Sequence, residues 1–388
     1  MKGLNIQLFV HDVNDAAVHR RAAMLAASGA NVTTLGFVRG EVHRKPVGTT
    51  TVVLGRTHNA RFLHRIGAVL RQLLTIGRKS TSANDANLII ARNLEMLLLG
   101  VVAARRTGRQ TPVVYECLDI HRLMLGGGII ARLLRALERR LAASCVGIIT
   151  SSPAYVEHYF HSTARINLPV VLIENRVFGL APLSASRPPA DAPPWVIAWN
   201  GAIRCAKSLA ILNEVTMRGE GSIRVVIRGR VSYDQIPDFD LVVAANPWID
   251  FRGAYRYPDD LDAIYDQVHF NWTIDMFWEG QNSTWALANR IYEGGRAGVV
   301  PMAQRSVETG HFYERLGIGI LLDELTALSV ERAILSMATE DYAAMRRDAA
   351  AVAKGVWTMG EAECRQLSSE LQALIPPKLS KDLSLIHI

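Results

Sequence analysis

Cysteine is scarce in this sequence. The 388 residues contain four cysteines, Cys117, Cys145, Cys205 and Cys364, and no two of them stand in a Cys-x-x-Cys pair or at another metal-ligand spacing. The pattern argues against a zinc site and against a disulfide framework. We therefore expect four free thiols in a reducing compartment.

Long hydrophobic runs are missing as well. The longest apolar run, Met96–Ala104, is far shorter than the roughly 20 residues that a membrane-spanning helix needs. The first residues lead directly into a strand-like pattern, so we expect no signal peptide. These features predict a cytoplasmic location and argue against a transmembrane protein.

Several catalytic and binding signatures are absent. No Gly-x-Gly-x-x-Gly follows the first predicted strand, and Gly126-Gly127-Gly128 lacks the Lys and the Ser or Thr of a P-loop. No serine nucleophile elbow, zinc-finger spacing, aromatic RNA-binding motif or compact basic recognition helix occurs. Dehydrogenases, P-loop enzymes, serine hydrolases and nucleic-acid-binding modules are therefore disfavoured.

What the sequence does contain is a repeated strand–helix alternation. Apolar residues make up 49% of the chain and charged residues 20%, as expected of a globular protein with a sizeable core. Short apolar strands alternate with helices through residues 1–180, and the alternation restarts at Trp195 after four prolines in Ser184–Pro194. The sequence predicts an α/β protein with two doubly wound Rossmann-like domains, 1–180 and 195–355, joined by a Pro-rich linker, 181–194. Ligands of such sheets bind beyond the carboxyl ends of the strands, in a cleft that we expect between the domains.

Charge is distributed unevenly between the two halves. Residues 1–180 carry 23 Lys and Arg but 10 Asp and Glu, whereas residues 181–388 carry 20 and 26. The basic half also contains two amphipathic helices, predicted at 59–77 and 129–143. These helices either contact an anionic membrane surface or are ordinary packing helices with solvated arginines.

The stretch Asn282–Gly295 has an unusual polar pattern. We expect one helix, capped by Asn282 and Ser283 and ended by Gly294-Gly295, with Trp285, Asn289 and Glu293 on one face. Its N-terminal N–H groups suit an anionic group such as a diphosphate. The alternative is a surface helix with an ordinary cap.

A second polar stretch follows the first strand of the second domain. Gly201 allows a ligand to approach the backbone closely, and Arg204 and Lys207 can meet phosphate oxygens. The alternative is a solvated, charged loop. Two Asp-x-Asp matches, at 238–240 and 260–262, are interpreted as solvated carboxylates and not as metal ligands.

Two loops of the first domain carry acid/base candidates. Asp119 and His121 follow a predicted strand, and Asp15 precedes the first helix. These side chains either deprotonate an acceptor hydroxyl or cap the helices that follow them.

Several of these segments, taken together, resemble a known family. The marks are Asn14-Asp15 with Arg20-Arg21, Tyr115-Glu116, Asp119-Ile120-His121, Glu138-Arg139-Arg140, Ser151-Ser152-Pro153, Gly201–Lys207, Gly253-Ala254-Tyr255, and Asn282–Gly295. Over nearly its whole length the chain is similar to GT-B glycosyltransferases, family-4-like, of the bacterial exopolysaccharide (succinoglycan-biosynthesis) type. The resemblance implies an N-terminal acceptor domain and a C-terminal nucleotide-sugar-binding domain. It also implies a C-terminal helix, 356–376, that crosses back to the first domain. Residues 377–388 are interpreted, from the sequence itself, as a tail that is not native.

The resemblance also implies roles for single residues. Arg204 and Lys207 match the diphosphate-binding cations, and Glu293 matches the second Glu of a Glu-x7-Glu motif that binds the donor ribose. The first Glu of that motif is replaced by Trp285. We expect Asn282, Ser283, Asn289 and Arg290 to replace its function.

The resulting prediction is a metal-independent hexosyltransferase without a cofactor. We expect it to move a hexose from a nucleotide sugar, with UDP as the expected nucleotide, to a lipid-linked oligosaccharide, with Asp15, Asp119 and His121 as candidate bases. We expect peripheral contact of the basic domain with the anionic inner face of the plasma membrane and no nucleic-acid partner. A sugar-nucleotide epimerase of the same fold and a non-catalytic scaffold of a polysaccharide assembly complex are the alternatives.

Overall fold

The computed structural model describes residues 3–38, 49–57, 62–83, 85–107, 110–180, 190–266 and 268–377. Two compact units share the chain. The first consists of Met1–Thr150, Tyr159–Ile173 and Glu361–Ile388, and the second of Ser151–His158 and Glu174–Gly360. Of the predicted linker, 181–189 lies outside the described residues, as does 378–388 of the predicted tail.

The first unit is built on a parallel sheet of seven strands, in the order β3-β2-β1-β4-β5-β6-β7. Its central strands are short runs rich in Val, Ile and Leu, as expected where both faces of a sheet are covered. The strands are β1 (Asn5–Val10), β2 (Asn31–Val38), β3 (Thr49–Arg56), β4 (Leu88–Arg92), β5 (Val113–Cys117), β6 (Gly147–Thr150) and β7 (Val170–Leu172).

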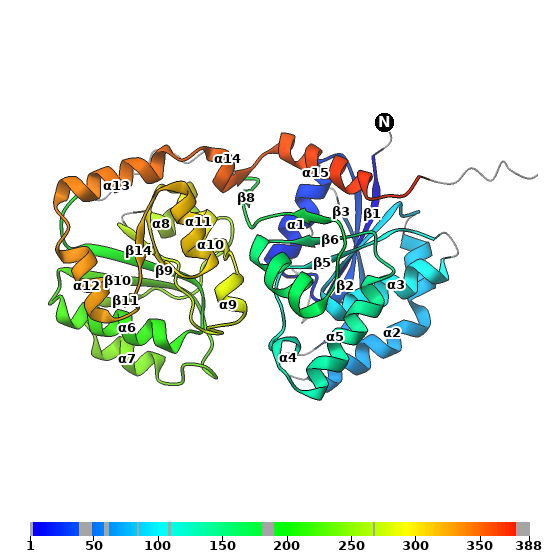
Figure 1. Ribbon diagram of the computed structural model, residues 1–388, viewed down its shortest axis with the longest axis horizontal. Coiled ribbons are helices and arrows are strands. Elements are labelled where there is room, and N and C mark those ends of the chain that lie inside the picture. Colours follow the sequence, from blue (N-terminus) through cyan, green and yellow to red (C-terminus); the bar gives the residue numbers. More distant parts are fainter. Residues whose placement is uncertain are drawn as a thin grey trace, which may run out of the picture. The chain divides into compact units, whose positions relative to one another are not determined.

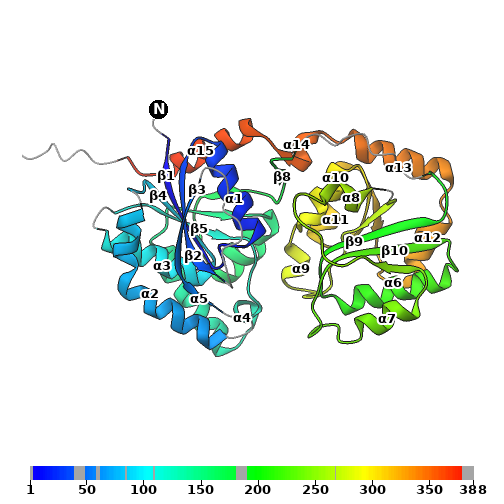
Figure 2. The same cartoon turned by 180° about the vertical axis from the view of Figure 1, so that it is seen from behind.

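Helices cover both faces of this sheet (Figure 1). They are α1 (Ala16–Ala27), α2 (Phe62–Ala83), α3 (Asn93–Arg106), α4 (Arg122–Leu125), α5 (Ile129–Ala142) and α15 (Glu361–Ala373). Both views show α15 beside α1, with α2, α3 and α5 on the other side (Figure 2). The end of α15 is held closely, because a Cβ on Gly147 would come 2.8 Å from Leu374 Cδ1. The last long helix thus completes the first unit.

The second unit has a parallel sheet of six strands, in the order β11-β10-β9-β12-β13-β14. They are β9 (Trp195–Ile203), β10 (Ile223–Val231), β11 (Ile249–Phe251), β12 (Phe270–Trp272), β13 (Val300–Gln304) and β14 (Ile320–Leu322). Two further short strands, β8 (Val177–Phe178) and β15 (Thr358–Met359), pair with each other in parallel.

The helices of the second unit are shorter on average. They are α6 (Ala206–Arg218), α7 (Phe239–Ala245), α8 (Leu261–Tyr265), α9 (Asn282–Trp285), α10 (Asn289–Arg296), α11 (Glu308–Leu316), α12 (Ala327–Leu335), α13 (Thr339–Ala351) and α14 (Lys354–Trp357). Figure 1 places α6, α7 and α12 on one side of the sheet and α8, α10 and α11 on the other.

Two parallel sheets with helices on both faces confirm the predicted α/β class with two Rossmann-like sheets. In each sheet the strand order reverses beside the first strand, between β1 and β4 and between β9 and β12. Such reversal points are where ligands bind in open α/β sheets. The chain also contains a π-helix, η1 (Tyr155–Ala164). Within the described residues, no helix is both long and apolar enough to cross a membrane.

Candidate functional site

Gly201 lies at the carboxyl end of β9, inside the strand and not in the loop that we predicted. Its φ of +108° favours glycine, and a Cβ built there would meet no heavy atom of the described residues within 4 Å. Its partner in the register, Gly229, packs so closely that a Cβ there would lie 1.8 Å from the Gly201 carbonyl oxygen. The space beside Gly201 stays open, so a ligand can approach the backbone.

Arg204 and Lys207 each pair with a carboxylate from the loop 273–281. Arg204 Nη2 lies 3.7 Å from Asp275 Oδ2, and its guanidinium lies 4.7 Å from the ring centroid of Phe277. Lys207 Nζ donates a hydrogen bond to Glu279. The Lys207 side chain is 64% exposed, so solvent weakens this pair. A diphosphate carries more negative charge than a carboxylate and can compete for both cations.

The predicted single helix at 282–293 is wrong, because the chain breaks between α9 and α10. Residue 286 is extended, with ψ of 137°, and Leu287 is buried. Side chains from three separate segments bind the carbonyls at the break: Ser152 Oγ to Trp285 O at 2.6 Å, Thr309 Oγ1 to Ala286 O at 3.2 Å, and Asn175 Nδ2 to Leu287 O at 2.8 Å. These bonds replace the helical ones and give α10 its own N-terminus.

The predicted cap at Asn282 and Ser283 is also wrong. Asn282 Oδ1 accepts a hydrogen bond from the Tyr155 hydroxyl at 2.8 Å, and Ser283 Oγ accepts from the Trp278 N–H at 3.0 Å. The first residue outside α9 is Gln281, whose side chain makes no cap hydrogen bond to the described residues. Both predicted cap residues instead fasten α9 to neighbouring segments of the second unit.

Trp285 does not share a helical face with Asn289 and Glu293, because the break separates them. Its ring stacks on His158, with centroids 5.8 Å apart and an interplanar angle of 18°. The expectation of one common face is therefore wrong for Trp285, while Asn289 and Glu293 keep their spacing within α10.

Of the predicted donor residues, α10 carries Asn289, Arg290 and Glu293. Asn289 is exposed at its first turn, whereas Glu293 is only 3% exposed. The Tyr265 hydroxyl lies 3.5 Å from Glu293 Oε2. Burial and then the charge of Glu293 raise the pKa of Tyr255, so this hydroxyl also stays protonated. A buried carboxylate beside tyrosine hydroxyls is suited to bind a vicinal diol.

Gly294-Gly295 does not end the helix, which continues to Arg296. A Cβ at Gly294 would lie 2.2 Å from Asn271 Nδ2, and one at Gly295 would lie 2.4 Å from the Trp357 ring. The two glycines are required by close packing of α10, not by a helix end.

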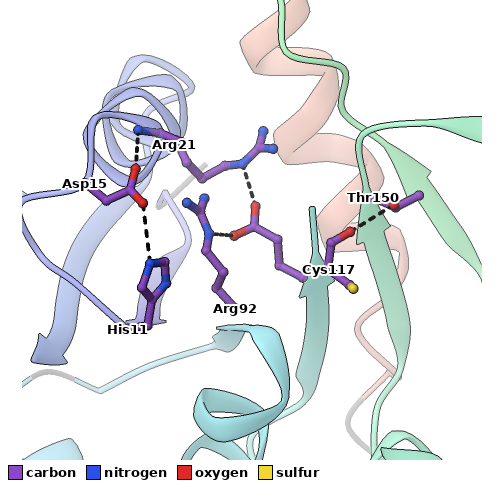
Figure 3. Close-up of polar contacts among 8 residues, drawn as sticks. His11, Asp15, Arg21, Arg92, Cys117 and Thr150 are labelled. Carbon is purple, nitrogen blue, oxygen red and sulfur yellow. Dashed lines mark hydrogen bonds and ion pairs between the residues drawn. The ribbon is translucent and has the colours of Figure 1, made fainter. Parts of the chain in front are cut away.

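In the first unit, Asp15 is the N-cap of α1, which confirms the capping alternative. Its Oδ1 accepts a hydrogen bond from the Ala17 N–H at 2.8 Å, and its Oδ2 lies 3.4 Å from His11 Nε2 (Figure 3). Burial raises the pKa of Asp15, but the His11 hydrogen bond and the Arg92 charge outweigh it and hold the pKa well below its ordinary value. A carboxylate with so low a pKa is a weak base.

Glu116 lies between two arginines beside this cap. Arg21 Nε is 2.7 Å from Glu116 Oε1 and Arg92 Nε is 2.6 Å from Oε2, and all three side chains are at most 5% exposed. Figure 3 shows Arg21 and Arg92 converging from α1 and β4. Burial raises the pKa of Glu116, but the two guanidinium charges outweigh it and lower the pKa. This carboxylate therefore holds α1 against β4 and β5, as a fully paired buried ion.

Asp119 and His121 come together at one cavity. It has a volume of about 330 Å³ and is enclosed by α2, α3, α4, α5 and the end of β5. His121 is also the N-cap of α4, since its Nδ1 accepts a hydrogen bond from the Leu123 N–H at 3.3 Å. Asp15 follows β1 and does not line this cavity, so the structure separates it from the other two candidates.

Two polar groups make contacts that the sequence did not predict. His11 pairs with Asp15, four residues further along the chain. Glu138 is fully buried on α5 and accepts hydrogen bonds from the hydroxyls of Tyr115 and Tyr159, both at 2.7 Å. No sequence pattern indicates that a Glu in so basic a helix faces inward.

Comparison with known proteins gives a relative in sequence and several solved structures of similar fold. The chain is 41% identical to the succinoglycan biosynthesis protein ExoL of Rhizobium meliloti, over 96% of this chain and 94% of that protein. No protein-family model matches the chain.

Solved structures resemble the fold over nearly the whole chain. Anabaena Alr3699/HepE in complex with UDP and glucose has a TM-score of 0.67 at 14% identity, over 95% of this chain and 99% of that one. Sucrose-phosphate synthase from Thermosynechococcus elongatus has a TM-score of 0.72 at 13% identity, over 96% and 99%. WaaG, a glycosyltransferase involved in lipopolysaccharide biosynthesis, has a TM-score of 0.63 at 9% identity, over 94% and 99%.

Proposed function

The chain belongs to the GT-B glycosyltransferases of the succinoglycan-biosynthesis type, and we propose that it moves a hexose from a UDP-sugar to a lipid-linked oligosaccharide. The binding of the donor is proposed from one observation. The backbone at Gly201 is open to a ligand, and the cations Arg204 and Lys207 follow within six residues. UDP is the nucleotide named with Alr3699/HepE, which shares the fold.

In this proposal the second unit binds the donor. Arg204 and Lys207 release Asp275 and Glu279 and bind the diphosphate, so that they stabilise the charge that develops as UDP departs. The N–H groups at the start of α10, where Asn289 and Arg290 lie, also stabilise the negative charge on the departing UDP. Glu293 binds the ribose hydroxyls. Asn282 and Ser283 act indirectly, by holding α9 in place.

For an inverting reaction, the structure favours Asp119 as the base. Asp15 is a weak base because its pKa is lowered, and the Nδ1 lone pair of His121 is engaged by a backbone N–H. Asp119 is exposed and lines the cavity. A retaining reaction needs no such base, since the departing phosphate can accept the proton.

We propose that the enzyme works without a divalent ion and at the membrane surface. Three carboxylates of the two Asp-x-Asp matches already have a protein donor: Asp240 from Tyr233, Asp260 from Arg256, and Asp262 from Arg296. Exposed arginines of α5, among them Arg132, Arg139 and Arg140, would face the anionic lipid of the inner leaflet.

A donor screen tests the function. Release of UDP or GDP would be measured for several nucleotide sugars, with membrane extract as the acceptor source and with excess chelator in a parallel series. We expect UDP release that depends on extract and is unchanged by chelator. Loss of all activity in chelator would refute metal independence.

A non-catalytic scaffold is the second candidate, because Trp285 stacks on His158 where the family carries an acidic residue. It predicts that UDP binds but that no sugar is transferred or hydrolysed in the donor screen.

A further inference from the structure

The cavity of the first unit has mostly apolar walls. Its 330 Å³ falls within the roughly 300–1,000 Å³ typical of ligand sites. Four helices contribute the walls, and the apolar lining includes Leu70, Leu94, Leu98, Met124, Leu134 and Leu137. A ligand that fills this space must be largely apolar.

The buried polar groups of the cavity are already satisfied. Both carboxyl oxygens of Glu138 accept a hydrogen bond from a tyrosine hydroxyl, and the Cys117 thiol contacts the Asp119 carbonyl oxygen at 3.7 Å. Burial raises the pKa of Glu138, which favours its neutral form, and the neutral carboxyl can donate its proton to one of these tyrosine oxygens. An apolar ligand can therefore cover this floor without leaving a new unpaired polar group.

Large exposed apolar side chains lie on two of the helices that line the cavity. Leu70 of α2 is 55% exposed, and Ile129, Ile130 and Leu133 of α5 are each at least 64% exposed. Ile130 and Leu133 stand one helical turn before Leu134 and Leu137, which line the cavity, so these side chains of α5 form an exposed apolar patch beside it. Exposed apolar patches mark interaction sites.

Basic side chains lie on α5 together with this patch, and on the neighbouring helix α4. Arg122, Arg132, Arg139 and Arg140 are exposed on α4 and α5. The patch thus combines apolar area with positive charge, which is complementary to a lipid that carries phosphate.

The polar part of the lining comes from the ends of two strands. Asn93 and Glu95 follow β4, and Asp119 and His121 follow β5. These residues lie at the carboxyl edge of the sheet, where ligands of open α/β sheets bind. The cavity therefore has polar residues at the edge of the sheet, which suit a saccharide, and apolar helix walls, which suit a hydrocarbon.

We propose that this cavity holds the first part of the hydrocarbon chain of the phosphate-linked lipid acceptor, an assignment that rests on the proposed function. The saccharide would lie at Asp119 and His121, the phosphate near the arginines of α4 and α5, and the chain between α2 and α5. Each methylene buried there should contribute about a fourfold gain in affinity.

Calorimetry with the full chain tests the assignment without relying on transferase activity. The probes are decyl phosphate, kept below its micelle concentration, and methyl phosphate. Leu98→Trp fills the cavity, and Leu137→Gln removes apolar surface from its partly exposed rim. Leu335→Gln is the matched control, because Leu335 is 42% exposed on α12 and Leu137 is 39% exposed.

We expect decyl phosphate to bind the wild type and the control alike, and both cavity variants about tenfold more weakly. Methyl phosphate should bind far more weakly to every protein. Equal binding of decyl phosphate to the wild type and Leu137→Gln would overturn the proposal, even if Leu98→Trp fails to fold. A dimer that Leu137→Gln dissociates, with decyl phosphate binding unchanged, would also overturn it and assign the patch to a second copy.

A kinetic experiment connects the cavity to the acceptor. Leu137→Gln should raise KM for a long-chain acceptor and leave KM for a short-chain acceptor with the same saccharide unchanged. Equal changes with both acceptors would contradict the assignment. Absence of sugar transfer by the wild type would refute the proposed function, whereas the calorimetry would still decide whether the cavity binds an alkyl chain.

Discussion

Three buried glutamates of this protein differ in how their oxygens are bound. Glu116 has arginine nitrogens at 2.6 and 2.7 Å, and Glu138 has two tyrosine hydroxyls at 2.7 Å. The contact of Glu293 with Tyr265 is longer, at 3.5 Å. The short bonds of Glu116 and Glu138 join neighbouring elements of the first unit, whereas Glu293 lies on α10 with Asn289 and Arg290, which are also proposed to bind the donor.

Glu293 is therefore expected to bind the ribose. Glu293→Gln keeps the size of the side chain but removes the charge that makes its hydrogen bonds to hydroxyls strong. We expect UDP to bind about tenfold more weakly, measured by calorimetry, with little change in the melting temperature. Glu340→Gln, at an exposed position on α13, is the control. Unchanged UDP affinity in Glu293→Gln would remove this residue from the donor site.

Asp15 makes stability depend on pH. Because its pKa is lower in the folded chain than its ordinary value of about 4, its charge stabilises the fold above that value. This stabilisation is lost as the pH falls through the lower, folded pKa. Asp15→Asn keeps a good N-cap but removes the charge.

The variant should be less stable than the wild type at neutral pH, and the two should converge in acid. Urea unfolding across the acid range measures the difference. A constant difference at every pH would show that the charge of Asp15 contributes nothing.

At the scale of elements, the largest departure from the sequence prediction is the division of one expected helix into α9 and α10. Local propensity at 282–293 favours a helix, but the break is held by Ser152, Thr309 and Asn175, which are distant in sequence. Propensity is a weak prior where tertiary contacts compete with it. Strand–helix alternation, by contrast, is a local pattern, and it was sufficient to predict both sheets.

The same limit applies to the candidate site. Gly201, Arg204 and Lys207 were recognisable because they lie together in the chain. The pairing of these cations with Asp275 and Glu279 depends on how a distant loop folds back, which a single sequence does not show. Gly294 and Gly295 were interpreted as a helix end. In the structure Asn271 packs against the first and the Trp357 ring against the second, so neither position has room for a Cβ.

Helical glycines provide a test of that packing. Gly294→Ala should destabilise the protein by about 1–3 kcal/mol, because its Cβ would displace Asn271 from its hydrogen bond to the Arg290 carbonyl. Gly67→Ala in α2 should instead stabilise it by about 0.5–1 kcal/mol, since a Cβ there meets no described atom within 4 Å. Denaturant unfolding measures both changes. Equal effects of the two substitutions would contradict the packing of α10.

At the scale of the whole molecule, the residues proposed to bind the acceptor and those proposed to bind the donor lie in different units. The first contains the basic helices, the apolar cavity and the candidate bases, and the second contains the residues proposed to bind the donor. This division agrees with the charge asymmetry of the sequence, whose basic half would face an anionic lipid acceptor.

The central claim is that Arg204 and Lys207 bind the diphosphate of a UDP-sugar during transfer. The most direct test compares the rate of hexose transfer by the wild type, by Arg204→Ala/Lys207→Ala, and by Arg218→Ala/Arg346→Ala. The last variant removes two arginines of the same unit that pair with Glu331 and with Asp191, which precedes the start of β9. We predict a loss of at least about a hundredfold in the first double variant, as for other groups that stabilise transition-state charge, and near wild-type rates in the second. Wild-type transfer rates in Arg204→Ala/Lys207→Ala would contradict the account.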